Sequence, residues 1–168
     1  MMNVKNREIE KKFLIKYPSA EFLSMIPSAD RSCIIQTYLL SEKGVASRVR
    51  KREYADGVRY TKTQKRRISD MSCFEDEREI SEPEYLNELQ NADPARNPVQ
   101  KERVLLRYDG HVFEIDLYPF WNDKAVMEVE LGSEEEEFTL PLGIDIIRDV
   151  TGDRRYKNAA LAKEIPND

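Results

Sequence analysis

Charged residues recur two positions apart along seven segments of this chain, in most of them between apolar residues, and this spacing is the feature that most constrains its fold. In a β-strand, residues two positions apart point to the same face of the sheet. The first such segment, residues 8–15, therefore places Glu8, Glu10 and Lys12 on one face, opposite a mainly apolar face. Repetition of this pattern predicts a mainly β protein whose antiparallel sheet has one charged and one apolar face.

The remaining elements follow from local signals. Asp56-Gly57 and Asp109-Gly110 predict tight hairpin turns between strands. Ser81 followed by Glu84 forms a capping box, and it predicts a helix that ends near Ala92. Shorter helical segments are expected at 20–26, at 140–150 and towards 162, with an acidic, capped turn at 133–136. The predicted strands are 6–16, 33–40, 46–52, 58–65, 75–80, 99–108, 111–118 and 125–131.

The length of 168 residues suits a single domain spanning 1–168, and 40% hydrophobic content is enough for a core. The net charge of −5 gives the chain no overall attraction for nucleic acid or for an anionic membrane. We find no run of 18 apolar residues and no signal-peptide core, so we expect a cytoplasmic protein, either monomer or homodimer. Cys33 and Cys73 are then expected to be free thiols.

The residue types exclude several kinds of site. The single histidine, His111, lies in a predicted hairpin turn, which disfavours multi-histidine zinc sites and a serine–histidine triad. Neither the P-loop nor the dinucleotide-binding glycine pattern is present. If the chain is an enzyme, its chemistry must come from carboxylates, lysines, arginines and a hard metal ion.

The charged positions are separated by sign from strand to strand. A solvated face would also be charged, and for any one strand that is the simpler explanation, but a surface selected for solubility intersperses its charges. Because the opposite faces are strongly apolar, we expect them to be covered and the charged faces to line the interior of a closed eight-stranded barrel. The charged positions are Glu8, Glu10, Lys12, Arg48, Arg50, Lys65, Glu77, Glu79, Lys101, Arg103, Glu114, Asp116, Glu128 and Glu130.

A charged interior indicates a highly charged ligand. Several inward lysines and arginines suit a polyanion, because a guanidinium can pair with two phosphate oxygens. The inward carboxylates would repel that polyanion unless divalent cations lay between them, and paired acids suit Mg²⁺ or Mn²⁺. The residues therefore predict metal-dependent handling of a polyphosphate.

The ordered motifs resemble those of the CYTH family, the triphosphate tunnel metalloenzymes. Glu8-x-Glu10-x-Lys12 resembles the ExExK signature of the family, and further motifs follow in the family order up to residue 162. The amino-acid sequence of the opening segment is most similar to that of the short bacterial tripolyphosphatase-like members. The further motifs are Arg48-x-Arg50, Thr63-x-Lys65, Glu77-x-Glu79, Lys101-x-Arg103, Glu114-x-Asp116, Glu128-x-Glu130 and the closing segment 150–162.

The resemblance implies a closed eight-stranded antiparallel β tunnel, with helices packed outside, that binds a triphosphate together with Mg²⁺ or Mn²⁺, as two ions. Phosphate-binding residues would be Lys12, Arg48, Arg50, Lys65, Lys101, Arg103, Arg155 and Lys157. Metal-binding residues would be Glu8, Glu10, Glu77, Glu79, Glu114, Asp116, Glu128 and Glu130. The catalytic set would be Glu8, Glu10, Lys12, Glu128 and Glu130.

One position departs from the family pattern. Many relatives have an arginine two residues before the Glu77-x-Glu79 pair, where this chain has Glu75. Either one phosphate contact is missing, or Arg52 or Arg67 supplies it.

The expected function is hydrolysis of inorganic tripolyphosphate or another triphosphate, by a metal-activated water that attacks the terminal phosphorus. An adenylate cyclase would need a base-binding region, for which we find no clear signal. A thiamine triphosphatase would need an aromatic mouth, for which Phe120 and Trp121 are candidates, although core or surface packing is the better explanation for both. A non-catalytic polyphosphate-binding module could lose its acids, so their presence here favours catalysis.

Overall fold

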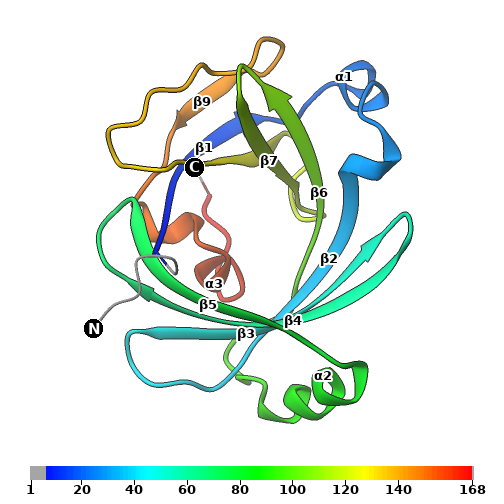
Figure 1. The fold of residues 1–168 in the computed structure, drawn as a ribbon, viewed down its shortest axis with the longest axis vertical. Helices are drawn as coiled ribbons and strands as arrows, with labels where there is room; N and C mark the ends of the chain where they lie inside the picture. The colour runs from blue at the N-terminus through cyan, green and yellow to red at the C-terminus, as the bar shows by residue number, and fades with distance from the viewer. Residues whose placement is uncertain (1–6, 168) are drawn as a thin grey trace.

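The computed structural model describes residues 7–167 and is built almost entirely from β-strands (Figure 1). The nine strands in this range are β1 Arg7–Lys16, β2 Arg31–Tyr38, β3 Val45–Tyr54, β4 Gly57–Arg67, β5 Ser72–Ile80, β6 Val99–Tyr108, β7 His111–Leu117, β8 Lys124–Glu130 and β9 Ile146–Asp149. The α-helices are α1 Ala20–Ser24, α2 Glu82–Glu88 and α3 Asn158–Leu161, and short 3₁₀ turns lie at η2 Ser28–Asp30, η3 Leu89–Asn91 and η4 Arg154–Tyr156.

Eight of the strands close into a barrel. Their order is β5-β4-β3-β2-β6-β7-β8-β1, and the paired strands are antiparallel. The ring closes where residues 7–9 of β1 pair with residues 72–74 of β5. The predicted closed, eight-stranded antiparallel barrel is therefore confirmed.

The ninth strand corrects one prediction. Residues 140–150 were expected to form a short helix, but Ile146–Asp149 form β9, which pairs with residues 13–15 of β1. β1 pairs with β5 only through residues 7–9, so the edge of its second half is left for another strand. Pro141 and Gly143 disfavour a helix, and β-branched Ile146 and Ile147 favour a strand that covers this edge.

The apolar faces of the strands point outward and are covered. Phe13, Phe113 and Met127 belong to a buried cluster against which α1 and the segment leading to β9 pack. Helix α2 covers β3 and β4, with Tyr85 against Tyr60. The Ser81 side chain accepts a hydrogen bond from the backbone N–H of Glu84 at 3.2 Å, which confirms the predicted helix start. No helix within residues 7–167 has the length and apolar character needed to cross a membrane.

A second buried cluster lies inside the barrel, at one end. The inward residues Leu14, Tyr38 and Val126 pack against Tyr156 and Leu161 of the C-terminal segment. Figure 1 shows α3 within the outline of the ring. The expectation that helices pack outside thus holds for α1 and α2 but not for α3, because its apolar residues fill this end of the interior.

Candidate functional site

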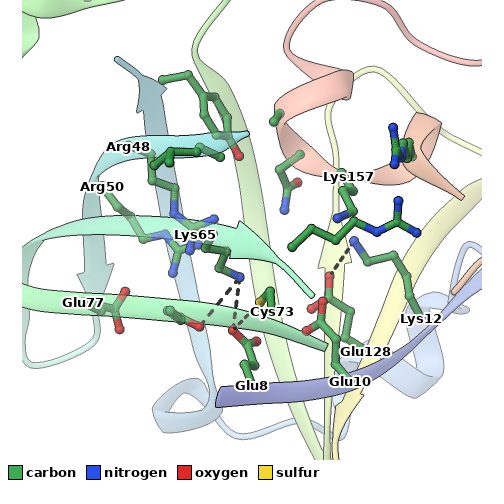
Figure 2. A pocket seen from close by; sticks show the side chains of 18 of the residues that line it. Glu8, Glu10, Lys12, Arg48, Arg50, Lys65, Cys73, Glu77, Glu128 and Lys157 are labelled. Atoms are coloured by element: carbon green, nitrogen blue, oxygen red, sulfur yellow. Dashed lines mark hydrogen bonds and ion pairs between the residues drawn. The ribbon is translucent and has the colours of Figure 1, made fainter. Parts of the chain in front are cut away.

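The charged faces of the strands enclose a cavity of about 750 Å³ (Figure 2). Ten basic and seven acidic side chains line it, so it carries an excess of three positive charges although the whole chain has a net charge of −5. This local reversal of sign favours an anionic ligand. The basic residues are Lys12, Arg48, Arg50, Arg52, Lys65, Arg67, Arg96, Arg103, Arg154 and Lys157, and the acidic ones are Glu8, Glu10, Glu75, Glu77, Glu114, Glu128 and Glu130.

Arg48 and Arg50 of β3 form a basic wall of the cavity. Both are buried, and no carboxylate within residues 7–167 lies within ion-pair distance of either. Arg50 donates to Gln36 Oε1 at 2.9 Å, whereas Arg48 Nε is buried without a hydrogen-bond partner. Burial and the charges of Arg48 and Arg103 lower the pKa of Arg50 to about 9. A buried, unsatisfied donor costs about 1–3 kcal/mol, so this wall is suited to an incoming anion.

Glu10 and Glu128 form the deepest part of an acidic group on β1 and β8. A hydrogen bond joins the two carboxyl groups, and Lys12 Nζ lies 3.3 Å from Glu128 Oε1. Burial and the Glu128 charge raise the pKa of Glu10 well above its usual value. Although burial opposes it, the Lys12 charge lowers the pKa of Glu128. Of the two carboxyl groups, Glu10 is therefore the one that binds a proton more readily.

Glu8 and Glu130 lie nearer to the solvent. Lys65 Nζ is 3.3 Å from Glu8 Oε2 and 3.8 Å from Glu75 Oε2, as Figure 2 shows for Glu8. Burial and the charges of Glu8 and Glu114 raise the pKa of Glu130. Cys73 also faces this group, but burial raises the pKa of its thiol to about 11, which disfavours the thiolate needed for a nucleophile.

The acidic group has the donor chemistry of a site for a divalent metal ion. Its donors are carboxylate oxygens, the ligands that Mg²⁺ and Mn²⁺ prefer. The carboxyl groups of Glu8, Glu10, Glu128 and Glu130 line one cavity, and burial and the neighbouring acids raise the pKa of Glu10, so added positive charge is favoured there. As they stand, no three acidic, histidine or cysteine side chains within residues 7–167 are arranged to hold an ion. The donor chemistry fits, and the individual ligands stay a prediction.

Lys101, Arg103 and Asp116 form a buried triad. Asp116 accepts hydrogen bonds from Lys101 Nζ at 2.8 Å and from Arg103 Nε and Nη2 at 2.8 and 2.9 Å. Although burial opposes it, the Arg103 and Lys101 charges lower the pKa of Asp116. Arg103 reaches the cavity, but Lys101 and Asp116 do not line it. The structure thus places two of the predicted site residues behind the wall of the site.

The predicted acids of β5 and β7 are divided between the cavity and its surroundings. Glu77 lines the cavity and accepts a hydrogen bond from Thr63 Oγ1 at 2.8 Å. Glu114 lines it as well and forms an ion pair with Arg103. Glu79 is exposed and lines a smaller side pocket instead.

The C-terminal segment contributes Lys157, which enters the cavity from above in Figure 2. Burial and the charges of Lys12 and Arg67 lower the pKa of Lys157. Arg155 lies outside the cavity, where its Nη2 is 2.8 Å from Asp153 Oδ2. Its neighbour Arg154 lines the cavity in its place.

Arg96 and Arg154 were missed by the sequence reasoning. Arg96 lies in the loop before β6 and Arg154 in η4, so no strand alternation marks the direction of either side chain. Arg52 and Arg67, the two residues considered as substitutes for the arginine that Glu75 replaces, both line the cavity.

Phe120 and Trp121 do not form an aromatic mouth. Trp121 is buried and packs against Tyr118 and Tyr156, and Phe120 stacks on Tyr118 with ring centroids 5.0 Å apart. Neither lines the cavity, so packing explains both residues.

Comparison with known proteins gives likenesses at the level of structure. No protein-family model matches the chain, and neither does any curated protein sequence. The inorganic triphosphatase NE1496 is 28% identical, with a TM-score of 0.59, and the match covers 99% of this chain and 98% of that one. A second structure of NE1496, described as a hypothetical protein, is 28% identical over 95% and 99% of the two chains, with a TM-score of 0.57.

The protein PH1819 from Pyrococcus horikoshii OT3 is 17% identical, with a TM-score of 0.58 over 76% of this chain and 80% of that one, a likeness of fold alone. The ordered strand motifs, the closed barrel with its charged interior and the full-length likeness to NE1496 agree with one another. In fold and in the order of its motifs, the chain thus resembles the CYTH, or triphosphate tunnel, proteins.

Proposed function

We propose that this protein hydrolyses inorganic tripolyphosphate or another triphosphate inside the barrel. The observation that carries the proposal is the arrangement of the cavity: unpaired buried arginines on one wall face a group of carboxylates on the other. The full-length likeness to the inorganic triphosphatase NE1496 supports the same reaction class.

The basic wall would bind the phosphate chain. Arg48 and Arg50 come from adjacent inward positions of β3, so their guanidinium groups can contact successive phosphoryl groups. Lys12 and Lys65 lie near the opposite acids and would hold the oxygens at the other side of the chain. Fixed positive charges in a cavity with little water stabilise the charge that develops on the leaving oxygen.

The acidic wall would act on the water that serves as the nucleophile. Glu130 is a candidate to accept a proton from the attacking water, because burial and the neighbouring acids raise its pKa. Glu8, Glu10, Glu128 and Glu130 would hold two Mg²⁺ or Mn²⁺ ions, with Glu77 and Glu114, which also line the cavity, as further ligands. When bound, such ions neutralise phosphate charge and lower the pKa of a bound water.

The test is phosphate release by the purified protein from tripolyphosphate, ATP, thiamine triphosphate and pyrophosphate, each with Mg²⁺, with Mn²⁺ and with EDTA. We expect metal-dependent release that is fastest with tripolyphosphate. Glu8→Gln should lose the activity, because it removes a cavity carboxylate. Glu102→Gln is the matched control, because Glu102 pairs with Arg31 away from the cavity.

Release that persists in EDTA would contradict the metal requirement. Silence with every substrate, combined with tight binding of tripolyphosphate, would refute the hydrolase and leave a binding protein or a cyclase.

A further inference from the structure

Two arginines extend the basic lining of the cavity beyond the strand motifs. Arg96 comes from the loop between α2 and β6, and Arg154 comes from η4 near the C-terminus. Both line the same cavity as Arg48, but neither belongs to a strand whose alternation would direct it inward. The phosphate-binding role of the inner arginines therefore leaves these two unexplained.

The Arg96 side chain is held in place, but its hydrogen-bond donors are not all satisfied. Its guanidinium lies 5.4 Å from the centre of the Tyr38 ring, and Tyr38 is the cross-strand partner of Arg48. Within residues 7–167 its one ion pair is a long one, 3.6 Å from its Nε to Asp93 Oδ2. Its Nε is buried and makes no hydrogen bond, the same condition as Arg48 Nε. Two buried guanidinium N–H groups of this cavity thus make no hydrogen bond, and Arg96 has only this distant carboxylate as a counter-charge.

Arg154 reinforces the positive charge at this end. No ion pair or side-chain hydrogen bond is found for it within residues 7–167, whereas the neighbouring Arg155 is paired with Asp153. Lys157 of the same segment also faces the cavity. The carboxylates of the cavity come from β1, β5, β7 and β8, and the one acid that pairs with these added cations is Asp93.

We propose that Arg96 and Arg154 form an outer subsite that binds a fourth phosphoryl group of a linear condensed phosphate. The proposal rests on the proposed function, because the first three phosphoryl groups would occupy the inner site between Arg48, Arg50 and the acids. A guanidinium binds phosphate oxygens in pairs, which would satisfy the free donor of Arg96. The cavity volume of about 750 Å³ lies in the range of pockets for ligands larger than a triphosphate.

The test is calorimetric binding of linear tripolyphosphate and linear tetrapolyphosphate to the intact protein in EDTA, so that hydrolysis is not needed as a readout. The wild type should bind the longer chain more tightly. Arg96→Gln and Arg154→Gln should each weaken tetrapolyphosphate binding about tenfold, the usual cost of a lost charged contact, and leave tripolyphosphate binding within twofold. Arg96→Lys should recover part of the loss, because it restores the charge without the paired donors.

Arg78→Gln is the matched control, because it removes one arginine from an exposed ion pair with Glu84. Equal weakening of both ligands by Arg96→Gln and Arg154→Gln would overturn the outer subsite and place these arginines in the inner site. Equal affinity of the wild type for the two chains would also overturn it. An absence of phosphate release in the earlier assay would refute the hydrolase without touching this binding comparison, so the two failures are distinguishable.

Discussion

The interior of the barrel holds two groups of buried charges that differ in how well they are satisfied. In the triad, Asp116 accepts three hydrogen bonds from Lys101 and Arg103, and all three residues are buried. On β3, Arg48 and Arg50 are equally buried but have no carboxylate partner in the described chain. Both groups arise from the same alternating strand pattern.

This difference in hydrogen bonding assigns a structural role to the triad and a ligand-binding role to Arg48 and Arg50. A buried ion pair with complete hydrogen bonding has no capacity left for a ligand, and removing one partner is costly. A buried guanidinium without a counter-ion is costly as it stands, so an anion that binds it removes the cost. The comparison therefore predicts that changes in the triad reduce stability, whereas changes on β3 reduce activity.

The largest effect is expected from Asp116→Asn. This change leaves Lys101 buried without its counter-charge and leaves Arg103 with Glu114 alone, and it should lower the free energy of unfolding by about 3–5 kcal/mol. Urea unfolding followed by circular dichroism measures the loss. Glu102→Gln is the matched control, because it breaks the part-exposed pair with Arg31 and should cost less than about 1 kcal/mol. A fully stable Asp116→Asn protein without activity would instead assign Asp116 to the metal site.

The opposite outcome is expected from Arg50→Gln. It removes a cavity cation whose pKa is already lowered to about 9 by burial and by the charges of Arg48 and Arg103. Stability should stay within about 1 kcal/mol of the wild type, because like-charge repulsion falls as the bond to Gln36 is lost. The rate of triphosphate hydrolysis should fall about 100-fold. An Arg50→Gln protein that is strongly destabilised but keeps full activity would contradict the comparison.

The sequence predicted the barrel well because strand alternation reports which face a residue occupies. Glu8, Glu10 and Lys12 line the cavity as expected, and the outward Phe13 and Ile15 are buried in the outer core. The same alternation could not distinguish the residues of the buried triad from those that line the cavity. Asp116 and Glu128 both face inward, and only the number of cations that reach each of them from the adjacent strands decides which is saturated.

The segments without alternation were predicted less well. Residues 146–149 form a strand because the edge of β1 is open, a feature that depends on where β5 turns away. In the closing segment, Arg154 rather than Arg155 reaches the cavity, because the 3₁₀ turn η4 buries Tyr156 and sets the directions of its neighbours. Such outcomes depend on tertiary contacts, which a local pattern does not contain.

A smaller effect should distinguish the acidic wall from the triad by pH. The raised pKa of Glu10 means that the folded protein holds a proton that the unfolded chain releases near pH 4.3. In metal-free buffer, stability should therefore fall as the pH rises above about 4.3, by up to about 1.4 kcal/mol per pH unit, until that proton is lost. Glu10→Gln should remove this slope, as measured by urea unfolding at several pH values.

The lowered pKa values of Asp116 and Glu128 act in the opposite direction and in a different window. Their contribution is present above the unfolded pKa of about 4 and is lost as the pH falls below it. A wild-type protein whose stability rises steadily from pH 4 to pH 7 would contradict the raised pKa of Glu10.

The smallest effect is expected outside the barrel, at His111. Its hydrogen bond to Glu136, 2.6 Å from Nε2 to Oε2, raises the pKa of the histidine. Protonation thus stabilises this contact below the unfolded pKa of about 6.5, and the benefit is lost as the pH rises through the folded pKa. The amide of Gly132 donates to the same carboxylate at 3.1 Å, so its hydrogen exchange reports the contact.

Protection of the Gly132 amide, corrected for the intrinsic exchange rate, should fall between pH 6 and pH 8.5 in the wild type and stay level in His111→Gln. The change should shrink in high salt, because exposed charges are screened. Equal protection in both proteins at both pH values would show that the histidine does not hold the loop. An effect of His111→Gln on stability as large as that of Asp116→Asn would show that an exposed charge contributes as much to this barrel as a buried one.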